Sequence, residues 1–487
     1  MTTDTDAPSA APIGVPAEPS RRWFVPDRGT VPFLLLGLLF FAVYAVIETV
    51  RYTHYSSMSW DLAIFVQEIQ QYAHLHAPIV NIKAPGYNIL GDHFSPILAL
   101  LAPFYRVFPS PVTLLVAQSA LFASSVAIVG ATAARFTSRA KGLCIGLAYG
   151  LSWGLQRGVD FDFHEICFAV PLLALVLRNI LLQRWYRAAF WALPLVLVKE
   201  DMGLTVAAIG IVLVLLRQYL VGAVLAVFGI VMLFLTVDLV IPHFNPHGQY
   251  DYMSKMPGGS PMHALSTSPL SLLHLLVTPD IKLQTVGYLL AITAFLALRS
   301  PLVLVVLPTL LWRFTSSNDS YWGMDWHYNA VLMPILFLAL VDAIRRSETY
   351  GPPQLRTFAS QAAVPAVTAV ALALTVTMSL PVLNALMPST YTQSDARVAM
   401  LRRASATIPN GATVEANVTL MAHLAGRTTL FWIGVDTVAP QYVALDLSYG
   451  WSSPPGDAAA YAQSLHPGSK YRLVFNEQEF QVAKLVN

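Results

Sequence analysis

Long apolar runs separated by short polar interruptions make up most of this chain. The runs recur between residues 32 and 383, and several approach the roughly 20 residues that a helix needs to cross a bilayer. We therefore predict a polytopic α-helical membrane protein. Some interruptions carry arginine and lysine, and others carry aspartate, glutamate and histidine, so the polar positions also contain topological information.

The basic interruptions predict which side of the membrane each connection occupies, because short cytoplasmic loops are enriched in arginine and lysine. Placing the basic groups at 135–141, 178–187, 217, 299 and 345–346 in the cytoplasm gives eleven spans, with the N-terminus inside and the C-terminus outside. The predicted spans are 32–50, 110–134, 142–156, 166–184, 188–198, 202–217, 219–241, 281–298, 300–313, 328–344 and 362–383.

The span 188–198 is short, and an alternative joins it to the next one across "VKEDM". A single span over 188–216 would bury Lys199, Glu200 and Asp201 near mid-bilayer, at a cost of very roughly 8–10 kcal/mol. It would also move Arg299, Arg345 and Arg346 to the outside. We therefore predict two short or tilted spans that turn at these charged residues on the outer face.

Three regions follow from this topology. Residues 1–31 are rich in Ala, Pro, Ser and Thr and are predicted to form a disordered cytoplasmic tail. Residues 32–383 form the membrane domain, with external loops at 51–95 and 242–268 and an interfacial or re-entrant helix at 94–111. Residues 384–487 are predicted to form a small extracytoplasmic α/β domain.

Within that last region, four segments have the alternation typical of strands: "ATVEANVTL", "RTTLFWIG", "QYVALDLSYG" and "YRLVFNEQEFQVAKLV". Helices are predicted at "QSDARVAMLRRASATI" and "GDAAAYAQSLH".

Composition agrees with the pattern of apolar runs. Hydrophobic residues make up 55% of the chain and charged residues 11%, and the mean hydropathy is +0.57. This balance excludes an ordinary soluble protein. The net charge of +2 says little about partners, and we expect no nucleic acid among them.

The acidic and histidine-containing clusters all fall on the predicted outer side. The first is "WDLAIFVQEIQQYAH", an amphipathic segment with Asp61 in its first helical turn. A carboxylate there is favoured by the exposed N–H groups of the helix, which is a purely structural explanation. The functional alternative is a general base facing a lipid-borne substrate.

Other clusters also allow two explanations. Asp92 and His93 in "LGDHFSP" fit a turn or a proton-accepting and phosphate-contacting pair. In "VDFDFHE", Asp160 and Asp162 share a face if the loop is extended, so that they could hold a divalent cation such as Mg²⁺ or Mn²⁺. His164 and Glu165 follow directly.

Two further clusters complete the outer face. Lys199, Glu200 and Asp201 are costly between apolar helices unless they are paired or hydrated. They fit either a self-neutralising turn or a phosphate-binding lysine with a positioning acid. His327 in "DWHYNA" could pair with Asp325, although Trp, Tyr and His are also ordinary interfacial residues.

Five motifs, in order, resemble an uncharacterised bacterial family of polytopic membrane proteins, the domain-of-unknown-function 2079 family. They are "WDLAIF", "GDHFSPILALLAPFY", "FDFHE", "LVKEDMGL" and "HYNAVLMPILFLAL". More distantly, the layout is similar to the GT-C superfamily of membrane glycosyltransferases. Two departures are that the first loop lacks the D-x-D of the oligosaccharyltransferases, and that "GDHFSP" replaces the Glu-Lys-Pro run of aminoarabinose and mannosyl transferases.

The GT-C resemblance implies an inverting hexosyl- or pentosyltransferase of the bacterial plasma membrane. Such an enzyme takes a sugar from a polyprenyl-phosphate donor to an envelope glycan, lipid or protein. The implied catalytic residues are Asp61, as general base, and Asp92. The implied substrate-binding residues are His93, Asp160, Asp162, His164, Glu165, Lys199, Glu200, Asp201 and His327, with His93 and Lys199 meeting the phosphate charge.

Two rival hypotheses belong to other classes. A transporter or lipid flippase of envelope precursors would need polar residues through the depth of the bilayer, whereas here the acids gather at one face, apart from Asp238. A non-catalytic scaffold that works through the C-terminal domain would leave the charged turn at Lys199 without a purpose.

Overall fold

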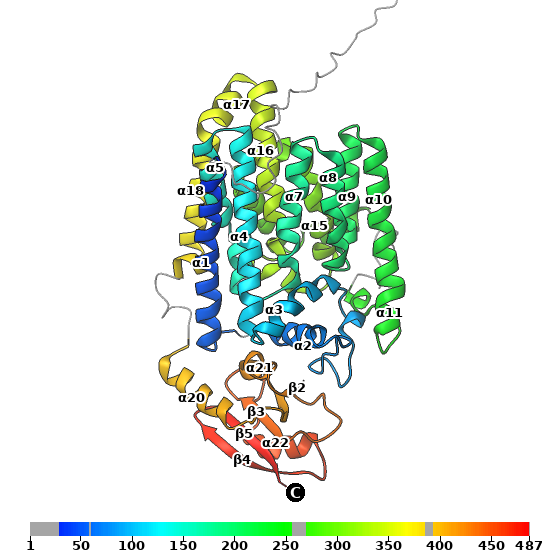
Figure 1. The fold of residues 1–487 in the computed structure, drawn as a ribbon, viewed down its shortest axis with the longest axis vertical. Coiled ribbons are helices and arrows are strands. Elements are labelled where there is room, and N and C mark those ends of the chain that lie inside the picture. Colours follow the sequence, from blue (N-terminus) through cyan, green and yellow to red (C-terminus); the bar gives the residue numbers. More distant parts are fainter. Residues whose placement is uncertain (1–28, 58–59, 256–268, 385–392, 487) are drawn as a thin grey trace, which may run out of the picture.

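The protein is a bundle of upright helices with a small α/β domain at one end (Figure 1). The computed structural model describes residues 29–57, 60–255, 269–384 and 393–486. The helices of the bundle are α1 (Val31–Thr53), α4 (Pro111–Phe136), α5 (Arg139–Gly150), α6 (Trp153–Asp160), α7 (Ala169–Leu181), α8 (Trp185–Ala192), α9 (Met202–Leu215), α10 (Tyr219–Phe234), α11 (Ile241–Phe244), α13 (Pro269–Val277), α14 (Ile281–Ala291), α15 (Leu307–Thr315), α16 (Leu332–Tyr350), α17 (Pro353–Thr357), α18 (Ala363–Thr377) and α19 (Pro381–Asn384).

Short 3₁₀ and π-helical segments extend or connect these helices. The 3₁₀ segments are Ile89–Gly91, Pro96–Leu101, Glu165–Cys167, Leu193–Leu197, Asp251–Lys255, Leu296–Arg299, Pro301–Val306, Asp319–Tyr321 and His327–Asn329, and the π-helical ones are Leu235–Val240 and Phe358–Ala362.

Five helical stretches among the described residues are long and apolar enough to cross a membrane: Val31–Thr53, Pro111–Phe136, Tyr219–Phe244, His327–Tyr350 and Pro353–Thr377. The first has 23 residues and is therefore about 35 Å long, which exceeds a hydrocarbon core of about 30 Å. The other predicted spans are shorter or interrupted. The span at 142–156, for example, is broken at Leu151 between α5 and α6. The polytopic helical architecture is thus confirmed, and the count of eleven spans stays a prediction.

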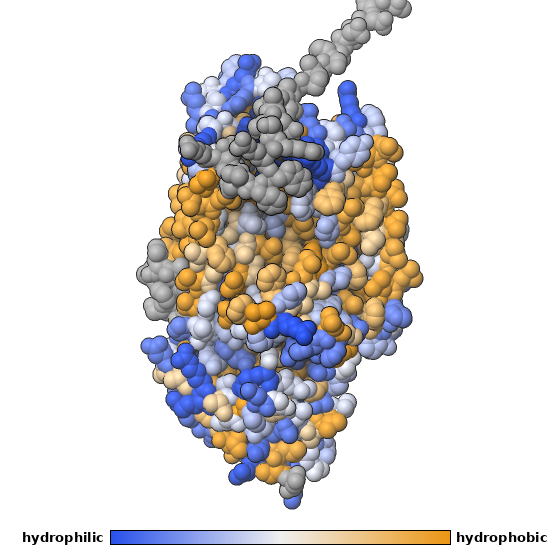
Figure 2. Space-filling model, in the orientation of Figure 1, coloured by the Kyte–Doolittle hydropathy of each residue, from blue (hydrophilic) through white to orange (hydrophobic). Residues whose placement is uncertain are grey.

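On the face shown in Figure 2, an apolar belt crosses the bundle and separates two more polar ends. Side chains that point out of α1 and α10, among them Leu35, Leu38 and Val227, are exposed and apolar. At the centre, α16 is almost completely buried. Because these exposed apolar faces lie on the outside of the bundle, the surface suits hydrocarbon rather than water.

Small residues allow α9 and α10 to pack closely against each other. Gly210 of α9 faces Gly222 of α10, and a Cβ atom added to either glycine would come within 2.6 Å of the backbone of the other helix. Such close approach through small residues is typical of helix pairs in membranes.

Two helices lie across the end of the bundle that faces the α/β domain: α2 (Asp61–Ala73) and α3 (Ala102–Val107) (Figure 1). The helix predicted at 94–111 occurs as a 3₁₀ segment, Pro96–Leu101, followed by α3. It ends before Ser110, whose side chain accepts a hydrogen bond from the Val112 backbone N–H and caps α4. Leu100, Phe104 and Phe108 on this segment are well exposed.

The α/β domain contains a five-stranded sheet in the order β2-β1-β3-β5-β4. Its strands are β1 (Thr413–Ala416), β2 (Thr429–Trp432), β3 (Tyr442–Asp446), β4 (Lys470–Glu477) and β5 (Phe480–Val486). The first three are parallel, with Val414 paired to Leu430 and to Tyr442, and β5 joins antiparallel to β3 and β4. The helices are α20 (Asp395–Ala406), α21 (Val418–Leu424) and α22 (Ala458–Leu465).

Most of this domain follows the sequence prediction. Residues 471–486 form a β-hairpin, and both predicted helices are present. "ATVEANVTL" was predicted as a strand only, whereas the strand ends at Ala416 and α21 begins at Val418. The helix forms there because β1 and β2 are parallel neighbours, which requires a crossover connection.

The α/β domain docks on the first loop of the membrane domain through specific contacts. The His423 ring of α21 stacks on Tyr55 and Tyr52, with ring centroids 3.8 and 4.3 Å away. Gln67 of α2 donates from Nε2 to the carbonyl of Leu430 in β2, at 2.9 Å. Burial lowers the pKa of His423 to about 3, so the ring is neutral where it packs. These contacts hold the sheet in a fixed position over α2.

The basic connections gather at the end of the bundle opposite this domain. Arg178 lies close enough to Arg184 and Arg135 to interact electrostatically with both. The Arg345 guanidinium lies over the Phe136 ring at the end of α4, 5.4 Å from its centroid. The arginine-bearing loops therefore share one end, as the sequence predicts, whereas the carboxylates described below share the other.

Candidate functional site

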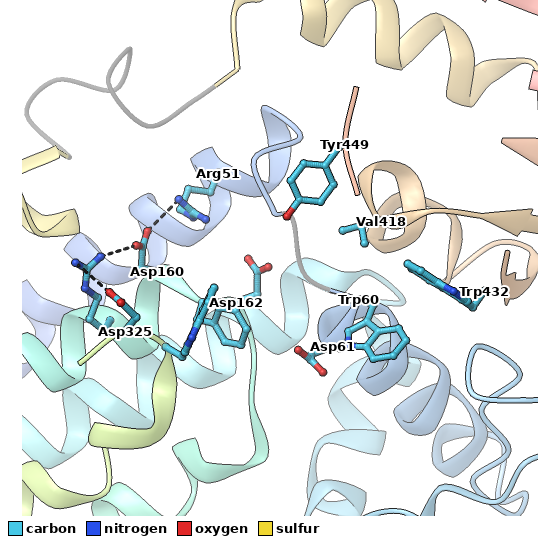
Figure 3. A pocket seen from close by; sticks show the side chains of 12 residues that line it. Arg51, Trp60, Asp61, Asp160, Asp162, Asp325, Val418, Trp432 and Tyr449 are labelled. Atoms are coloured by element: carbon cyan, nitrogen blue, oxygen red, sulfur yellow. Dashed lines mark ion pairs between the residues drawn. The ribbon is translucent and has the colours of Figure 1, made fainter. Parts of the chain in front are cut away.

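A cavity of about 670 Å³ lies between the end of the bundle and the α/β domain (Figure 3). Its lining comes from the ends of α1 and α6, the start of α2, the loop before α16 and three places in the α/β domain. The lining residues are Arg51, Trp60, Asp61, Arg157, Asp160, Phe161, Asp162, Asp325, Trp326, Val418, Trp432 and Tyr449.

Asp61 is the first residue of α2, and its carboxylate points into this cavity (Figure 3). The helix N-terminus stabilises a negative charge at this position. His164 Nε2 lies 3.6 Å from Asp61 Oδ2, and the Asp61 side chain is 30% exposed. The carboxylate is therefore accessible from the cavity and has an imidazole beside it.

Arginine and aspartate side chains form a chain along another part of the wall. Arg51 Nη1 lies 3.0 Å from Asp160 Oδ1, whereas Arg157 lies 3.5 Å from Asp160 and 3.6 Å from Asp325. The Nε atoms of both arginines are buried without a hydrogen-bond partner in the described part of the chain. These Nε atoms are out of reach of a ligand, but each Nη atom carries two N–H groups, so donors remain beyond the contacts to Asp160, Asp325 and the Ser56 carbonyl.

The loop that carries Asp162 is hydrogen-bonded to Gln118 of α4. Gln118 Nε2 donates to the Asp162 carbonyl at 2.7 Å, and Gln118 Oε1 accepts from the His164 backbone N–H at 3.0 Å. Glu48 of α1 in turn accepts from Gln118 at 2.7 Å. These bonds fix Asp162 at a φ of 62°, a left-handed conformation that aspartate adopts more readily than most residues.

Asp162 is 4% exposed, and burial raises the pKa of its carboxyl group to about 6, against the opposing effect of Arg51. The native state therefore holds a proton here in a pH range where the unfolded chain, with a pKa of 3.8, has lost it. This contribution to stability is complete below pH 3.8 and is lost as the pH rises through about 6.

We accordingly expect Asp162→Asn to become more stable relative to the wild type by about 2 kcal/mol between pH 4 and pH 7. Thermal unfolding of both proteins in detergent, scanned at several pH values, measures the difference. A difference in stability that is the same at every pH would contradict the assignment.

Three rings extend the site behind Asp61. The rings of His164 and His327 stack with their centroids 3.7 Å apart, and Phe161 stacks on both. Both histidines are buried. Nδ1 of His164 and both ring nitrogens of His327 have no hydrogen-bond partner among the described residues. The expected pairing of His327 with Asp325 does not occur, because Asp325 faces Arg157 instead.

A second polar cluster, which we call the ionic network, adjoins the cavity. Lys199 Nζ lies 2.8 Å from Glu165 Oε1, and the Glu165 side chain is almost completely buried. Burial alone would lower the pKa of Lys199, but Glu165, Glu200 and Asp201 raise it well above its usual value. The lysine is therefore protonated, and the neighbouring carboxylates balance its charge. A phosphate would have to compete with these carboxylates.

The rest of the ionic network centres on Glu200. Its Oε1 accepts from Tyr250 at 2.9 Å and lies 2.9 Å from His93 Nδ1. Burial would raise the pKa of Glu200, yet His93 and Lys199 lower it to about 2. Asp92 forms an ion pair with Lys83 at 2.9 Å. Lys199, Glu200, His93 and Asp92 each have a charged partner that the sequence could not name, whereas Asp201 Oδ1 has no hydrogen-bond partner among the described residues.

The sequence-predicted residues thus lie at one end of the molecule but do not all line one cavity. Asp61, Asp160 and Asp162 line it, and His164 adjoins it through Asp61. Asp92, His93, Glu165, Lys199, Glu200 and Asp201 belong to the ionic network or adjoin it, and His327 lies in the ring stack. They divide in this way because the loop at 51–95 pairs with the turn at Lys199, with His93 Nδ1 2.9 Å from Glu200 Oε1.

Sequence reasoning missed the arginines and the aromatic residues of the cavity. Arg51 and Arg157 stand next to acidic clusters on the predicted outer side, where arginine is depleted, and that exception to the charge rule could have revealed them. Trp432 and Tyr449 carry no such signal, because only the docking of the α/β domain brings them to the cavity.

A divalent cation at Asp160 and Asp162 does not fit this arrangement well. Asp160 is paired with two arginines, which repel a cation. Among the described residues, no group of three or more His, Cys, Asp or Glu side chains is arranged to hold a metal ion. A divalent cation at this site therefore stays a prediction.

The fold and the cavity define a polytopic helical membrane protein with an α/β domain at one end. The structure is similar to that of ArnT from Cupriavidus metallidurans bound to undecaprenyl phosphate, with a TM-score of 0.52 at 11% identity over 92% of this chain and 97% of ArnT. The apo form of the same protein gives a TM-score of 0.47 at the same identity and coverage. Residues 51–482 match the family described as predicted membrane protein DUF2079, and the chain belongs to this family. No curated protein matches it in sequence.

Proposed function

We propose that this protein is a membrane glycosyltransferase that moves a sugar from a polyprenyl-phosphate donor to an extracytoplasmic glycan, lipid or protein. The observation that carries the proposal is the position of Asp61, which lines one cavity together with Arg51 and Arg157. That cavity is lined both by the end of the bundle and by the α/β domain, so it lies beyond the apolar belt at the more polar end of the bundle. A lipid phosphate likewise has its charged group beyond the apolar part of the bilayer.

Each part of the cavity has a role in this reaction. The acceptor hydroxyl oxygen attacks the anomeric carbon, and the bond from that carbon to the phosphate oxygen breaks, so that the configuration inverts. Asp61 takes the hydroxyl proton as general base. Polyprenyl phosphate leaves with one more negative charge than it had in the donor.

The two arginines stabilise this developing charge. Arg51 and Arg157 offer planar arrays of N–H donors that suit phosphate oxygens, and they bind the leaving group more strongly than the donor because its charge is greater. This assignment replaces Lys199 and His93 in the phosphate role, because neither of them lines the cavity. In the proposal, the ionic network instead holds loop 1 and the turn at Lys199 in position.

The sidedness of the reaction follows from the two ends of the bundle. The arginine-bearing loops at one end fit the cytoplasm, and the cavity and the α/β domain at the other fit the exterior. The N-terminus is then cytoplasmic, and the donor is used on the outer face of the plasma membrane.

A reconstituted assay tests this function against the transporter alternative. Purified protein in liposomes receives a polyprenyl-phosphate sugar labelled in the sugar, together with a bacterial envelope extract as acceptor. We expect the label to pass to the acceptor fraction with release of polyprenyl phosphate. Movement of intact labelled lipid across the bilayer, with no release, would identify a flippase instead.

A further inference from the structure

The α/β domain supplies a wall of the cavity through three residues from one edge of its sheet. Val418 begins α21 just after β1, Trp432 is the last residue of β2, and Tyr449 follows the end of β3. Because β1, β2 and β3 are parallel, their carboxyl ends meet at the same edge. In open α/β sheets, ligands bind at this edge where the chain leaves neighbouring strands in opposite directions.

This sheet has such a reversal at β1. The chain passes from β1 to β2 on one side and then from β2 to β3 on the other side of β1. The cavity therefore opens at the place in the α/β domain where a ligand site is expected on topological grounds alone.

Aromatic rings dominate this wall. The rings of Trp60 and Trp432 meet edge to face with centroids 5.2 Å apart. Trp60, Trp326 and Tyr449 are 38%, 41% and 44% exposed, which is high for large aromatic rings. Exposed ring faces are electron-rich and attract the polarised C–H bonds on the face of a sugar ring, and the Tyr449 hydroxyl offers a hydrogen bond at the rim.

The aromatic and cationic walls lie on different sides of Asp61. In Figure 3, Trp60, Val418, Trp432 and Tyr449 lie on one side of the cavity and Arg51, Asp160 and Asp325 on the other, with Asp61 and Asp162 between them. An inverting displacement needs the nucleophile and the leaving group on opposite sides of the anomeric carbon. If the arginines hold the donor phosphate, the aromatic wall is the side from which an acceptor arrives.

We propose that the wall formed by Trp60, Val418, Trp432 and Tyr449 binds the acceptor, and that this acceptor is a saccharide whose ring stacks on the tryptophans. The inference rests on the proposed function for its direction of attack. In this proposal the α/β domain recognises the acceptor, and three loops at one edge of its sheet determine which acceptor binds.

Binding and transfer are tested separately so that the two proposals can fail independently. The full-length protein in nanodiscs is applied to an array of bacterial envelope oligosaccharides, without any donor. We expect the wild type to retain a subset of them and Trp432→Ala to bind that subset about tenfold or more weakly. Trp432→Phe keeps an aromatic ring and is expected to restore most of the binding.

The control is Val438→Ala, at an exposed position of the same domain outside the cavity, which is expected to bind as the wild type does. Thermal unfolding checks that Trp432→Ala is folded. A wild type that retains no saccharide, or equal retention by wild type and folded Trp432→Ala, overturns the inference, even if transfer from the donor is observed. Retention that depends on Trp432, without any transfer, supports the acceptor wall and counts against the proposed function.

Discussion

Replacing Asp61 by asparagine is expected to lower the rate of sugar transfer by about 100- to 10,000-fold, the range that a general base contributes. The substitution keeps the size of the side chain and its place in the first turn of α2, but the amide does not accept the hydroxyl proton at neutral pH. Steady-state rates with saturating donor and acceptor measure the effect. Donor binding should change little, because the phosphate contacts come from Arg51 and Arg157.

A matched control distinguishes chemistry from local structure. Asp319 is an exposed carboxylate that does not line the cavity, and Asp319→Asn is expected to keep the full rate. Transfer by folded Asp61→Asn within a few-fold of the wild-type rate would remove Asp61 from the mechanism. Equal loss in both variants would point to an effect on folding.

Replacing Lys199 by methionine is expected to destabilise the protein by about 3–5 kcal/mol. Lys199 is the partner of Glu165, at 2.8 Å, and the Glu165 side chain is 3% exposed, so removal of the lysine leaves a buried carboxylate without its cation. Methionine fills a similar volume, which separates the loss of charge from the loss of packing. Thermal unfolding in detergent measures the loss.

The double variant Lys199→Met with Glu165→Gln provides the control. It removes both charges, and we expect it to recover more than half of the lost stability, because replacing both members of a buried pair is often nearly neutral. If the single variant unfolds as the wild type does, the pair is not a structural element. The sequence-based hypothesis that Lys199 and His93 bind the phosphate would then be favoured again.

The sequence predicted the architecture well because its signals are local. Apolar runs placed helices at the predicted spans, the Pro-Ser-Pro at 109–111 marked the start of α4, and the arginines marked one end of the bundle. The prediction of a strand alone for "ATVEANVTL" was partly wrong, because the helix after β1 is required by the parallel pairing of Thr413 with Thr429, 16 residues further along the chain.

The site was predicted only in part, for reasons that are equally physical. Clusters such as "VDFDFHE" can be recognised in the sequence because charges next to apolar runs are costly. Their partners cannot be recognised, because Glu165 pairs with Lys199 and His93 pairs with Glu200 only through the packing of distant segments. The same holds for Trp432, whose place in the cavity depends on how the α/β domain docks over α2.

The central claim is that the cavity beside Asp61 holds the phosphate of a polyprenyl lipid, and binding of polyprenyl phosphate tests it most directly. Arg157→Met is the most informative variant, because Asp160 keeps Arg51 at 3.0 Å and the Asp325 side chain is 68% exposed, so no buried charge is left unpaired. Arg139→Met, at the exposed start of α5 on the opposite end, is the matched control.

Native mass spectrometry of the three proteins with polyprenyl phosphate gives the relative affinities. The account predicts that Arg157→Met binds the lipid roughly 10- to 100-fold more weakly than the wild type, the loss expected for a hydrogen bond to a charged group, and that Arg139→Met binds it normally. Equal binding by the wild type and Arg157→Met, or a loss in Arg139→Met instead, would contradict it.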